Sequence, residues 1–285
     1  KCDYCDFLSG PAGEKEKEEY VKMLVDEIRN CPDTVQNYRV ISIFFGGGTP
    51  SLLTGEQIGR LMDTVREIFT LDEDAEITME MNPGTVTEEK LRKYRQAGVN
   101  RLSIGLQSVN DEELRLLGRI HTYEEFREAY HLARANGFSN INVDLISAIP
   151  GQTVESWRRT LEQVMALSPE HISAYSLIIE EGTPFYERFA EDEQIREEGG
   201  HPRLLPEEDV ERQMYELTEA FLHTKGYERY EISNYAKPGY ECRHNKGYWT
   251  GTEYLGLGLG ASSYINIRRE KGEAAKISAS GKESG

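Results

Sequence analysis

The chain has 285 residues, of which 38% are hydrophobic, enough for one large α/β domain or for one domain with a small extension. Its formal net charge of -17 argues against nucleic acid or an anionic membrane surface as the main partner. The longest apolar runs, such as residues 41–45, are far too short for a transmembrane segment. Four cysteines in a chain of this length are no disulfide framework, so we expect a cytoplasmic protein.

Short β-branched runs alternate with amphipathic stretches along the chain. In chain order, the sequence predicts helix 14–30, strand 40–45, helix 55–69, strands 76–81 and 101–105, helix 123–136, strand 140–146, helix 153–167, strand 171–177 and helix 210–225. Because parallel neighbours need crossover helices, this alternation predicts a parallel sheet. The strands look nearly continuously apolar, which is typical of a sheet covered on both faces or of a barrel wall.

The remaining segments carry weaker signals. Residues 187–201 are polar and end in glycines, so we expect a surface loop or linker, and residues 230–235 are a further candidate strand. The stretch 253–266 contains three glycines at alternate positions. The charged, then Ser/Gly/Lys-rich tail 268–285 is expected to be disordered, or to be the start of a truncated segment.

Glycines, an amide and carboxylates follow several predicted strands. They are the run Gly46-Gly47-Gly48-Thr49-Pro50, then Glu80, Gln107, Asp144 and Ser176. In parallel α/β folds the chemistry gathers beyond the carboxyl ends of the strands. The pattern therefore indicates a ligand site there, although ordinary turn chemistry would use the same residue types.

Cys2 and Cys5 form a C-x-x-C pair, a spacing that lets two thiolates face one metal. Soft thiolates favour zinc, copper(I) or iron–sulfur clusters. Zinc would need four ligands, and Cys31 and Cys242 have no partner at ligand spacing apart from His244. A thioredoxin-type redox pair would normally follow a first strand, which is not visible upstream of Cys2.

The surroundings of this pair carry a family resemblance. Residues 1–7 (KCDYCDF) resemble the end of the C-x-x-x-C-x-x-C loop of radical S-adenosylmethionine (radical SAM) enzymes, in which three cysteines bind a [4Fe–4S] cluster. The first of these cysteines would precede Lys1, so we expect the sequence either to be a fragment or to be unable to hold the cluster normally as it stands.

The resemblance extends through nearly the whole chain, and it narrows to the coproporphyrinogen dehydrogenase-like group. The segments that carry it are FGGGTPS (45–51), EMNP (80–83), LSIGLQS (102–108), DLI (144–146) and IPGQ (149–152). Residues 244–249 (HNKGYW) are similar to the H-N-x-x-Y-W stretch of the haem-chaperone branch of this group. The resemblance implies an α/β fold, a partial (β/α)6 TIM-like barrel over residues 1–190, with a small, truncated C-terminal extension over 191–285.

The resemblance also implies roles for individual residues. Cys2 and Cys5 would be cluster ligands, with Tyr4 packed beside the cluster. S-adenosylmethionine would be bound by Gly47, Gly48, Thr49, Glu80, Gln107, Arg119, Asp144, Ile178 and Ser262, although many relatives have His in place of Ser262. His244 would contact haem, since imidazole is a common axial ligand of haem iron. Alternatively, His244 caps a turn, and Tyr248 and Trp249 pack in the core instead of stacking on a porphyrin.

Two branches of the group differ after the third cysteine. The dehydrogenases usually continue as C-x-x-C-x-C, whereas Asp6 and Phe7 follow Cys5 here. The resemblance therefore implies haem binding and delivery to haem-acceptor proteins, with a reductant protein serving the cluster. Oxygen-independent oxidation of coproporphyrinogen III is the alternative, and a zinc-binding module is a third class.

Overall fold

The computed structural model describes residues 1–8 and 10–265, so the predicted disordered tail lies outside the described residues. The strands are β1 (Arg39–Phe45), β2 (Thr70–Met81), β3 (Arg101–Gln107), β4 (Ile141–Ser147), β5 (His171–Ser176), β6 (Glu228–Arg229) and β7 (Asn234–Ala236). The helices are α1 (Glu14–Arg29), α2 (Asp33–Gln36), α3 (Gly55–Ile68), α4 (Glu88–Ala97), α5 (Asp111–Leu116), α6 (Tyr123–Ala135), α7 (Val154–Met165), α8 (Pro184–Glu197), α9 (Glu208–Thr224) and α10 (Arg243–Thr250).

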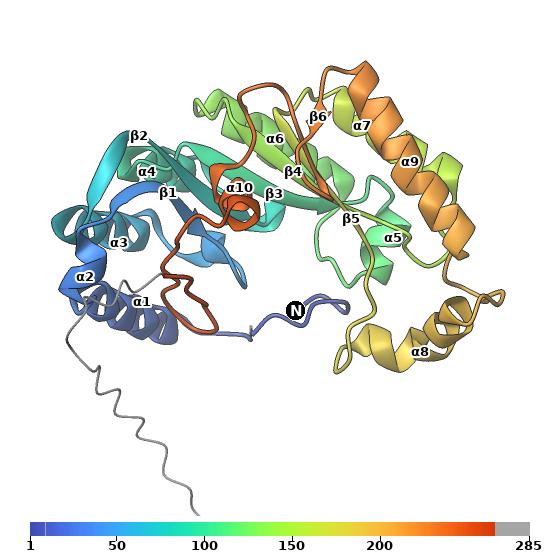
Figure 1. Cartoon of the computed structure of the whole chain (residues 1–285), viewed down its shortest axis with the longest axis horizontal. Coiled ribbons are helices and arrows are strands. Elements are labelled where there is room, and N and C mark those ends of the chain that lie inside the picture. Colours follow the sequence, from blue (N-terminus) through green and yellow to red (C-terminus); the bar gives the residue numbers. More distant parts are fainter. Residues whose placement is uncertain (9, 266–285) are drawn as a thin grey trace, which may run out of the picture.

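The strands of the described residues form one sheet in the order β1-β2-β3-β4-β5-β7-β6 (Figure 1). Strands β1 to β5 are parallel neighbours, as the sequence predicts. The sixth place is taken by β7, which is antiparallel to both β5 and β6. The sheet curves but does not close, because β1 and β6 remain at opposite edges. The predicted partial α/β barrel is therefore confirmed, with an antiparallel hairpin at one edge.

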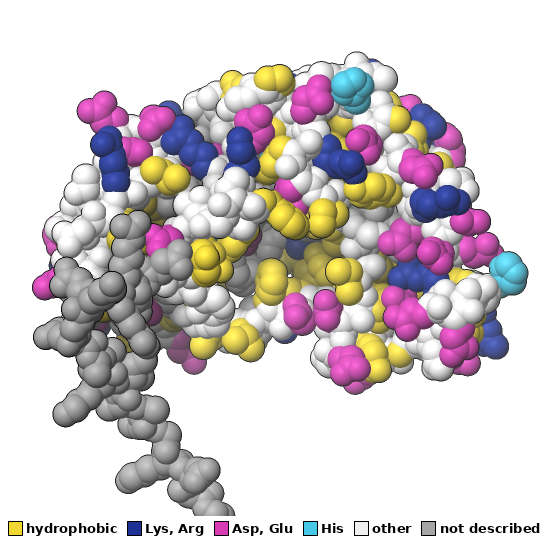
Figure 2. Space-filling model, viewed as in Figure 1, with side chains coloured by type: hydrophobic (Ala, Val, Ile, Leu, Met, Phe, Trp, Pro, Cys, Tyr) yellow, Lys and Arg dark blue, Asp and Glu magenta, His cyan; other side chains and the backbone are white. Residues whose placement is uncertain are grey.

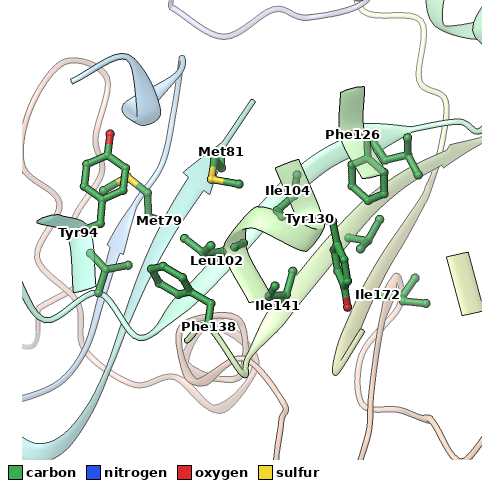
Figure 3. Close-up of a cluster of buried hydrophobic side chains, with 14 of the residues drawn as sticks. Met79, Met81, Tyr94, Leu102, Ile104, Phe126, Tyr130, Phe138, Ile141 and Ile172 are labelled. Carbon is green, nitrogen blue, oxygen red and sulfur yellow. The ribbon is translucent and has the colours of Figure 1, made fainter. Parts of the chain in front are cut away.

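Apolar side chains on the outer face of the sheet pack against the helices (Figure 3). Leu102 and Ile104 of β3 and Ile141 of β4 belong to a buried cluster that includes Phe126 and Tyr130 of α6. Full burial of such a side chain stabilises the fold by about 1.5–3 kcal/mol. Burial of this outer layer therefore stabilises the fold.

Threonines begin three of the covering helices through capping boxes. The side chains of Thr54, Thr122 and Thr153 each accept a hydrogen bond from the backbone N–H three residues on. The side chain of that third residue in turn accepts a hydrogen bond from the backbone N–H of the threonine. This exchange satisfies two backbone groups that a helix start leaves unpaired. The helices that follow β1, β3 and β4 thus begin where the local sequence specifies.

The opposite, inner face of the sheet is polar, so the expectation of nearly continuously apolar strands was wrong. Arg101 and Ser103 of β3 alternate with Leu102 and Ile104, and they line an internal cavity instead of the core cluster. Asn142 and Asp144 of β4 and Ser173 of β5 line the same cavity. Successive side chains of a strand point to opposite faces of the sheet. The polar residues at every second position of these strands therefore lie on the inside of the half-barrel.

Two predicted segments are also corrected. Residues 187–201 are not a loop, since α8 covers Pro184–Glu197 and buries Phe185 and Phe189 in a second apolar cluster. The strand predicted over 230–235 is mainly a turn, because β6 ends at Arg229 and β7 begins at Asn234. The proposed division near residue 190 stays a prediction. Strands from both sides of it join the one sheet.

Across residues 1–8 and 10–265, no helix has the length and apolar character needed to cross a bilayer.

Candidate functional site

The Cys2–Cys5 segment forms a turn at the carboxyl-end side of the sheet. The backbone N–H of Cys5 donates to the carbonyl of Cys2 at 3.3 Å. Between them, the Asp3 N–H donates to the Leu117 carbonyl at 3.1 Å, and the Asp3 carbonyl accepts from Phe185 N–H at 3.0 Å. These bonds fix the turn beside the end of α5 and the start of α8 (Figure 1). Both cysteines are half-buried free thiols.

Arg119 joins this turn to the ends of two strands. Its Nη1 lies 3.5 Å from Cys2 Sγ, and its Nη2 donates to the Gly105 carbonyl of β3 at 2.8 Å and to Asn82 Oδ1, just after β2. Burial raises the pKa of the Tyr4 hydroxyl, while the nearby Arg119 opposes that shift. The structure thus brings the predicted residues Cys2, Tyr4 and Arg119 together.

The glycine turn after β1 meets the end of β2. Gly47 has φ +106°, a backbone conformation that side chains disfavour, and its N–H donates to Glu80 Oε2 at 3.2 Å. Gly48 is exposed and Thr49 half-buried in the same turn. Burial, reinforced by the neighbouring Asp144, raises the pKa of Glu80 to about 8. Backbone donors and a carboxyl of raised pKa therefore lie at one strand end.

Gln107 and Asp144 complete the predicted polar set on β3 and β4. Gln107 is buried and has φ +74°, which is uncommon for a residue other than glycine and often occurs at functional sites. Asp144 accepts hydrogen bonds from Ser103 Oγ at 3.0 Å and from Asn142 Nδ2 at 2.7 Å, while burial raises its pKa.

Glu80 and Asp144 line a cavity of about 200 Å³ on the inner face of the sheet. Figure 2 shows that this face of the molecule is hollowed near its centre and that hydrophobic side chains surround the hollow. The cavity is lined by Phe44, Glu80, Arg101, Ser103, Asn142, Asp144, Ser173, Tyr175, His244, Asn245 and Tyr248. Residues from β1 to β5 and from α10 thus line one largely polar cavity that is open on one side.

His244 lies on α10 at this cavity. Its ring stacks on Phe44 with centroids 4.6 Å apart and meets the Tyr248 ring edge-on at 4.9 Å. Burial lowers the pKa of the imidazole, and the charge of Arg101 lowers it further, so the ring is neutral at neutral pH. Helix α10 has Cys242 as its N-cap, without a side-chain cap bond, so His244 does not cap it.

The histidines on the inner face differ in how their nitrogens are used. His171 bonds Asn142 Oδ1 at 2.6 Å through Nδ1 and the Tyr230 hydroxyl at 2.8 Å through Nε2. Within the described part of the chain, neither ring nitrogen of His244 makes a hydrogen bond or ion pair. Neither nitrogen is among the fully buried polar atoms that lack a partner. His171 is therefore a structural histidine, whereas the lone pair of a neutral His244 is available to a ligand.

Four other predicted residues need separate mention. Tyr248 and Trp249 are 51% and 61% exposed, so neither is a core residue. Ile178 follows β5 and is exposed. Ser262 lies in a loop that packs on α1 through a bond from Gly258 N–H to Glu27 Oε2 at 3.0 Å. No hydrogen bond joins Ser262 to the cavity residues within residues 1–8 and 10–265, so the roles of Ile178 and Ser262 stay predictions.

The sequence prediction missed several lining residues, namely Phe44, Arg101, Asn142, Ser173 and Tyr175. Their signal was present as alternation, in Arg101-Ser103-Gly105 of β3 and in Asn142-Asp144 of β4. Counting polar residues at every second strand position would have found the polar members of this set, but not Phe44.

The two further cysteines lie elsewhere. Cys31 Sγ contacts the Glu27 carbonyl in α1 at 3.5 Å, and Cys242 Sγ contacts Glu76 Oε1 at 3.3 Å. Among the residues that the structure describes, no group of three or more His, Cys, Asp or Glu side chains is arranged to hold a metal ion. The zinc-module interpretation, which needs four protein ligands, gains no support there.

Sequence comparison assigns the family. The family model described as "Radical SAM superfamily" matches residues 1–164. The chain belongs to the radical SAM superfamily. It is 43% identical over 268 residues to the haem chaperone HemW of Escherichia coli, covering 94% of this chain and 68% of that protein. It is 37% identical to HemW of Bacillus subtilis over 270 residues, covering 94% of this chain and 69% of that protein.

Among solved structures, coproporphyrinogen III oxidase (HemN) from Escherichia coli, described as a radical SAM enzyme, is similar with a TM-score of 0.75. It is 30% identical, and the match covers 93% of this chain and 62% of that protein, so the chain spans less than two thirds of it. The superposition supports the half-barrel fold.

Membership of the superfamily implies a [4Fe–4S] cluster and S-adenosylmethionine as cofactors. The residues present fit both groups. Cys2 and Cys5 are soft sulfur donors on one fixed turn, suited to iron. For S-adenosylmethionine, Arg119 Nε is buried without a partner in the described chain, and the Gly46 backbone lies so close to Phe44 that an added Cβ would be 2.8 Å from its ring. A side chain at Gly46 would therefore clash with Phe44, so the turn keeps this path only with glycine there.

Proposed function

We propose that this chain is a radical SAM haem-binding protein that delivers haem to haem-requiring acceptor proteins in the cytoplasm. The observation that carries the proposal is the unused imidazole of His244, neutral at neutral pH and placed between aromatic rings at the mouth of a polar cavity. Neutral imidazole is the form that binds haem iron. The similarity to proteins named haem chaperones supports the same assignment.

In this proposal the chain's own residues bind and orient the cofactors. Cys2 and Cys5 hold the cluster, with Tyr4 beside it. Gly47, Gly48, Thr49, Glu80, Gln107, Arg119 and Asp144 bind S-adenosylmethionine, and Ile178 and Ser262 lie toward its adenosine. When bound and reduced by a partner protein, the cluster would supply the electron for S-adenosylmethionine chemistry.

Haem would bind outside the narrow part of the cavity. A cavity of 200 Å³ lies below the range of about 300–1,000 Å³ that encloses a whole organic ligand. The macrocycle would therefore lie against the exposed rings of Tyr248 and Trp249, with His244 as its axial ligand.

Haem titration of a His244→Ala variant tests the proposal. The wild-type chain should bind one haem and show the absorption spectrum of imidazole-ligated iron, and His244→Ala should lose that spectrum. His223→Ala is the matched control, since His223 is an exposed surface histidine with 70% side-chain exposure. Retention of the wild-type spectrum and affinity by His244→Ala would overturn the haem assignment.

Oxidation of coproporphyrinogen III is the second candidate, favoured by the fold similarity to HemN. It predicts oxygen-free turnover of coproporphyrinogen III by cluster-loaded protein supplied with S-adenosylmethionine and reductant. The absence of a cysteine at Asp6 or Phe7 favours the haem-carrier proposal instead. Turnover that persists in His244→Ala would favour the enzyme over the carrier.

A further inference from the structure

Among the residues that the structure describes, Arg101 is a buried cation without a hydrogen-bonded partner. It is the first residue of β3, only 1% exposed, and its side chain lines the inner cavity. Its Nε is buried without a hydrogen bond, and its guanidinium makes no hydrogen bond or ion pair in the part of the chain that the structure describes. Arginine is almost never fully buried unless it is paired, because burying an unpaired charge costs free energy. The burial of Arg101 therefore points to a ligand that pairs with it.

Among the described residues, no carboxyl group forms a hydrogen bond or ion pair with Arg101, although its charge counteracts the rise that burial causes in the pKa of Asp144. Asp144 accepts from Ser103 and Asn142, and Glu80 accepts from Gly47 N–H. Glu76 Oε1 accepts from Arg243 N–H at 2.9 Å and contacts Cys242 Sγ at 3.3 Å. Arg101 is the one Arg or Lys among the residues that line the cavity. The cavity wall therefore includes one guanidinium group whose N–H donors make no hydrogen bond to the described residues.

The shape of the cavity restricts what that guanidinium group can bind. The cavity is too small for a whole porphyrin, yet its wall also includes the rings of Phe44, His244 and Tyr248. A ligand with an aromatic body against those rings could extend only a short polar arm inward. Guanidinium matches a carboxylate with two parallel hydrogen bonds, a pairing about twice as strong as one between neutral groups.

We propose that Arg101 binds a carboxylate arm of the ligand, and specifically a propionate of the porphyrin whose iron His244 coordinates. The inference rests on the proposed haem function and extends it, since it assigns a residue that recognises a propionate at the edge of the porphyrin. Arg119, in contrast, already contacts Cys2, Asn82 and Gly105 at the carboxyl ends of the strands. The two arginines thus serve two different ligands.

Paired titrations with haem and with its dimethyl ester test this inference on the full chain. The ester removes the negative charges but keeps the ring and the iron. Wild-type protein should bind haem about tenfold or more tightly than the ester, as expected for a buried charge-assisted pair. Arg101→Met should bind both porphyrins with the weaker affinity, and Arg101→Lys should keep part of the preference. Arg92→Met, at an exposed arginine of α4, should behave as wild type.

The outcomes separate the two proposals. Equal binding of haem and ester by the wild type, still lost in His244→Ala, overturns the Arg101 assignment and leaves the haem function intact. Failure of the wild type to bind either porphyrin overturns both. A third arm measures S-adenosylmethionine binding to cluster-loaded protein. A loss of that affinity in Arg101→Met, with the porphyrin preference unchanged, assigns the carboxylate to S-adenosylmethionine and overturns the propionate assignment.

Discussion

The two faces of the same sheet are built from opposite kinds of side chain. On β3, Leu102 and Ile104 pack under the helices, whereas Arg101 and Ser103 face the internal cavity. One strand thus contributes both to the core and to the wall of the cavity, because successive side chains point to opposite faces. The comparison teaches that substitutions one residue apart should affect different properties, with stability assigned to the outer face and ligand recognition to the inner.

The largest expected effect is on the outer face. Phe126→Ala removes a side chain of α6 that is 0% exposed in the core cluster. The unfolding free energy should fall by about 3–5 kcal/mol, because the lost burial and the remaining cavity both contribute. Urea denaturation followed by circular dichroism measures it. Ile120→Ala, at a residue 90% exposed, is the control and should change stability by less than about 0.5 kcal/mol.

An intermediate effect is expected at Glu80 on the inner face, and it depends on pH. The folded-state pKa of about 8 lies above the ordinary value of 4.5, so the folded protein holds a proton that the unfolded chain releases in this range. Wild-type stability should therefore fall as pH rises from 4.5 to 8. Glu80→Gln, which remains neutral, should lack this slope and gain roughly 3.5 kcal/mol relative to wild type between pH 5 and pH 8.

Denaturation curves of both proteins across that pH range measure the difference. The Gln amide oxygen can still accept the bond from Gly47 N–H, so the variant isolates the charge. Parallel pH profiles for wild type and Glu80→Gln would show that Glu80 titrates normally, which would contradict the buried environment described for the inner face.

The smallest expected effect is at Ser103. Ser103→Ala removes the hydroxyl that donates to Asp144 Oδ2 at 3.0 Å and accepts from Asn142 Nδ2 at 2.7 Å. Stability should fall by only about 2 kcal/mol, since two hydrogen bonds are lost and each contributes about 1 kcal/mol net. Calorimetry measures the shift, and Leu102→Ala next to it should cost about 2–5 kcal/mol. Similar costs at both positions would remove the distinction between the two faces.

Much of the scaffold was accessible from sequence because local patterns specify it. The predicted strand 171–177 and helix 55–69 match β5 and α3 to within one residue at each end. In both cases β-branched or amphipathic runs end at recognisable turn or cap residues. Helix α8 was missed because its charged residues obscure the spacing of Phe185, Phe189 and Asp192, which are its buried residues.

The site was less accessible, because its parts meet only through long-range packing. Family motifs pointed to Glu80 and His244, yet their place on one cavity depends on α10 crossing the inner face, which no local pattern predicts. Arg101 carried no motif at all. Its importance follows from burial without a partner, a property that exists only in the folded chain.

The backbone bonds of Asp3 have a consequence for how the protein matures. The turn between Cys2 and Cys5 is held on one side by Leu117 and on the other by Phe185, more than a hundred residues away in sequence. Contacts of such long range form late, since closing the intervening chain costs entropy before any bond is made. We therefore expect the thiols to take their positions only after the barrel has folded, so that iron and sulfide are installed into a folded scaffold.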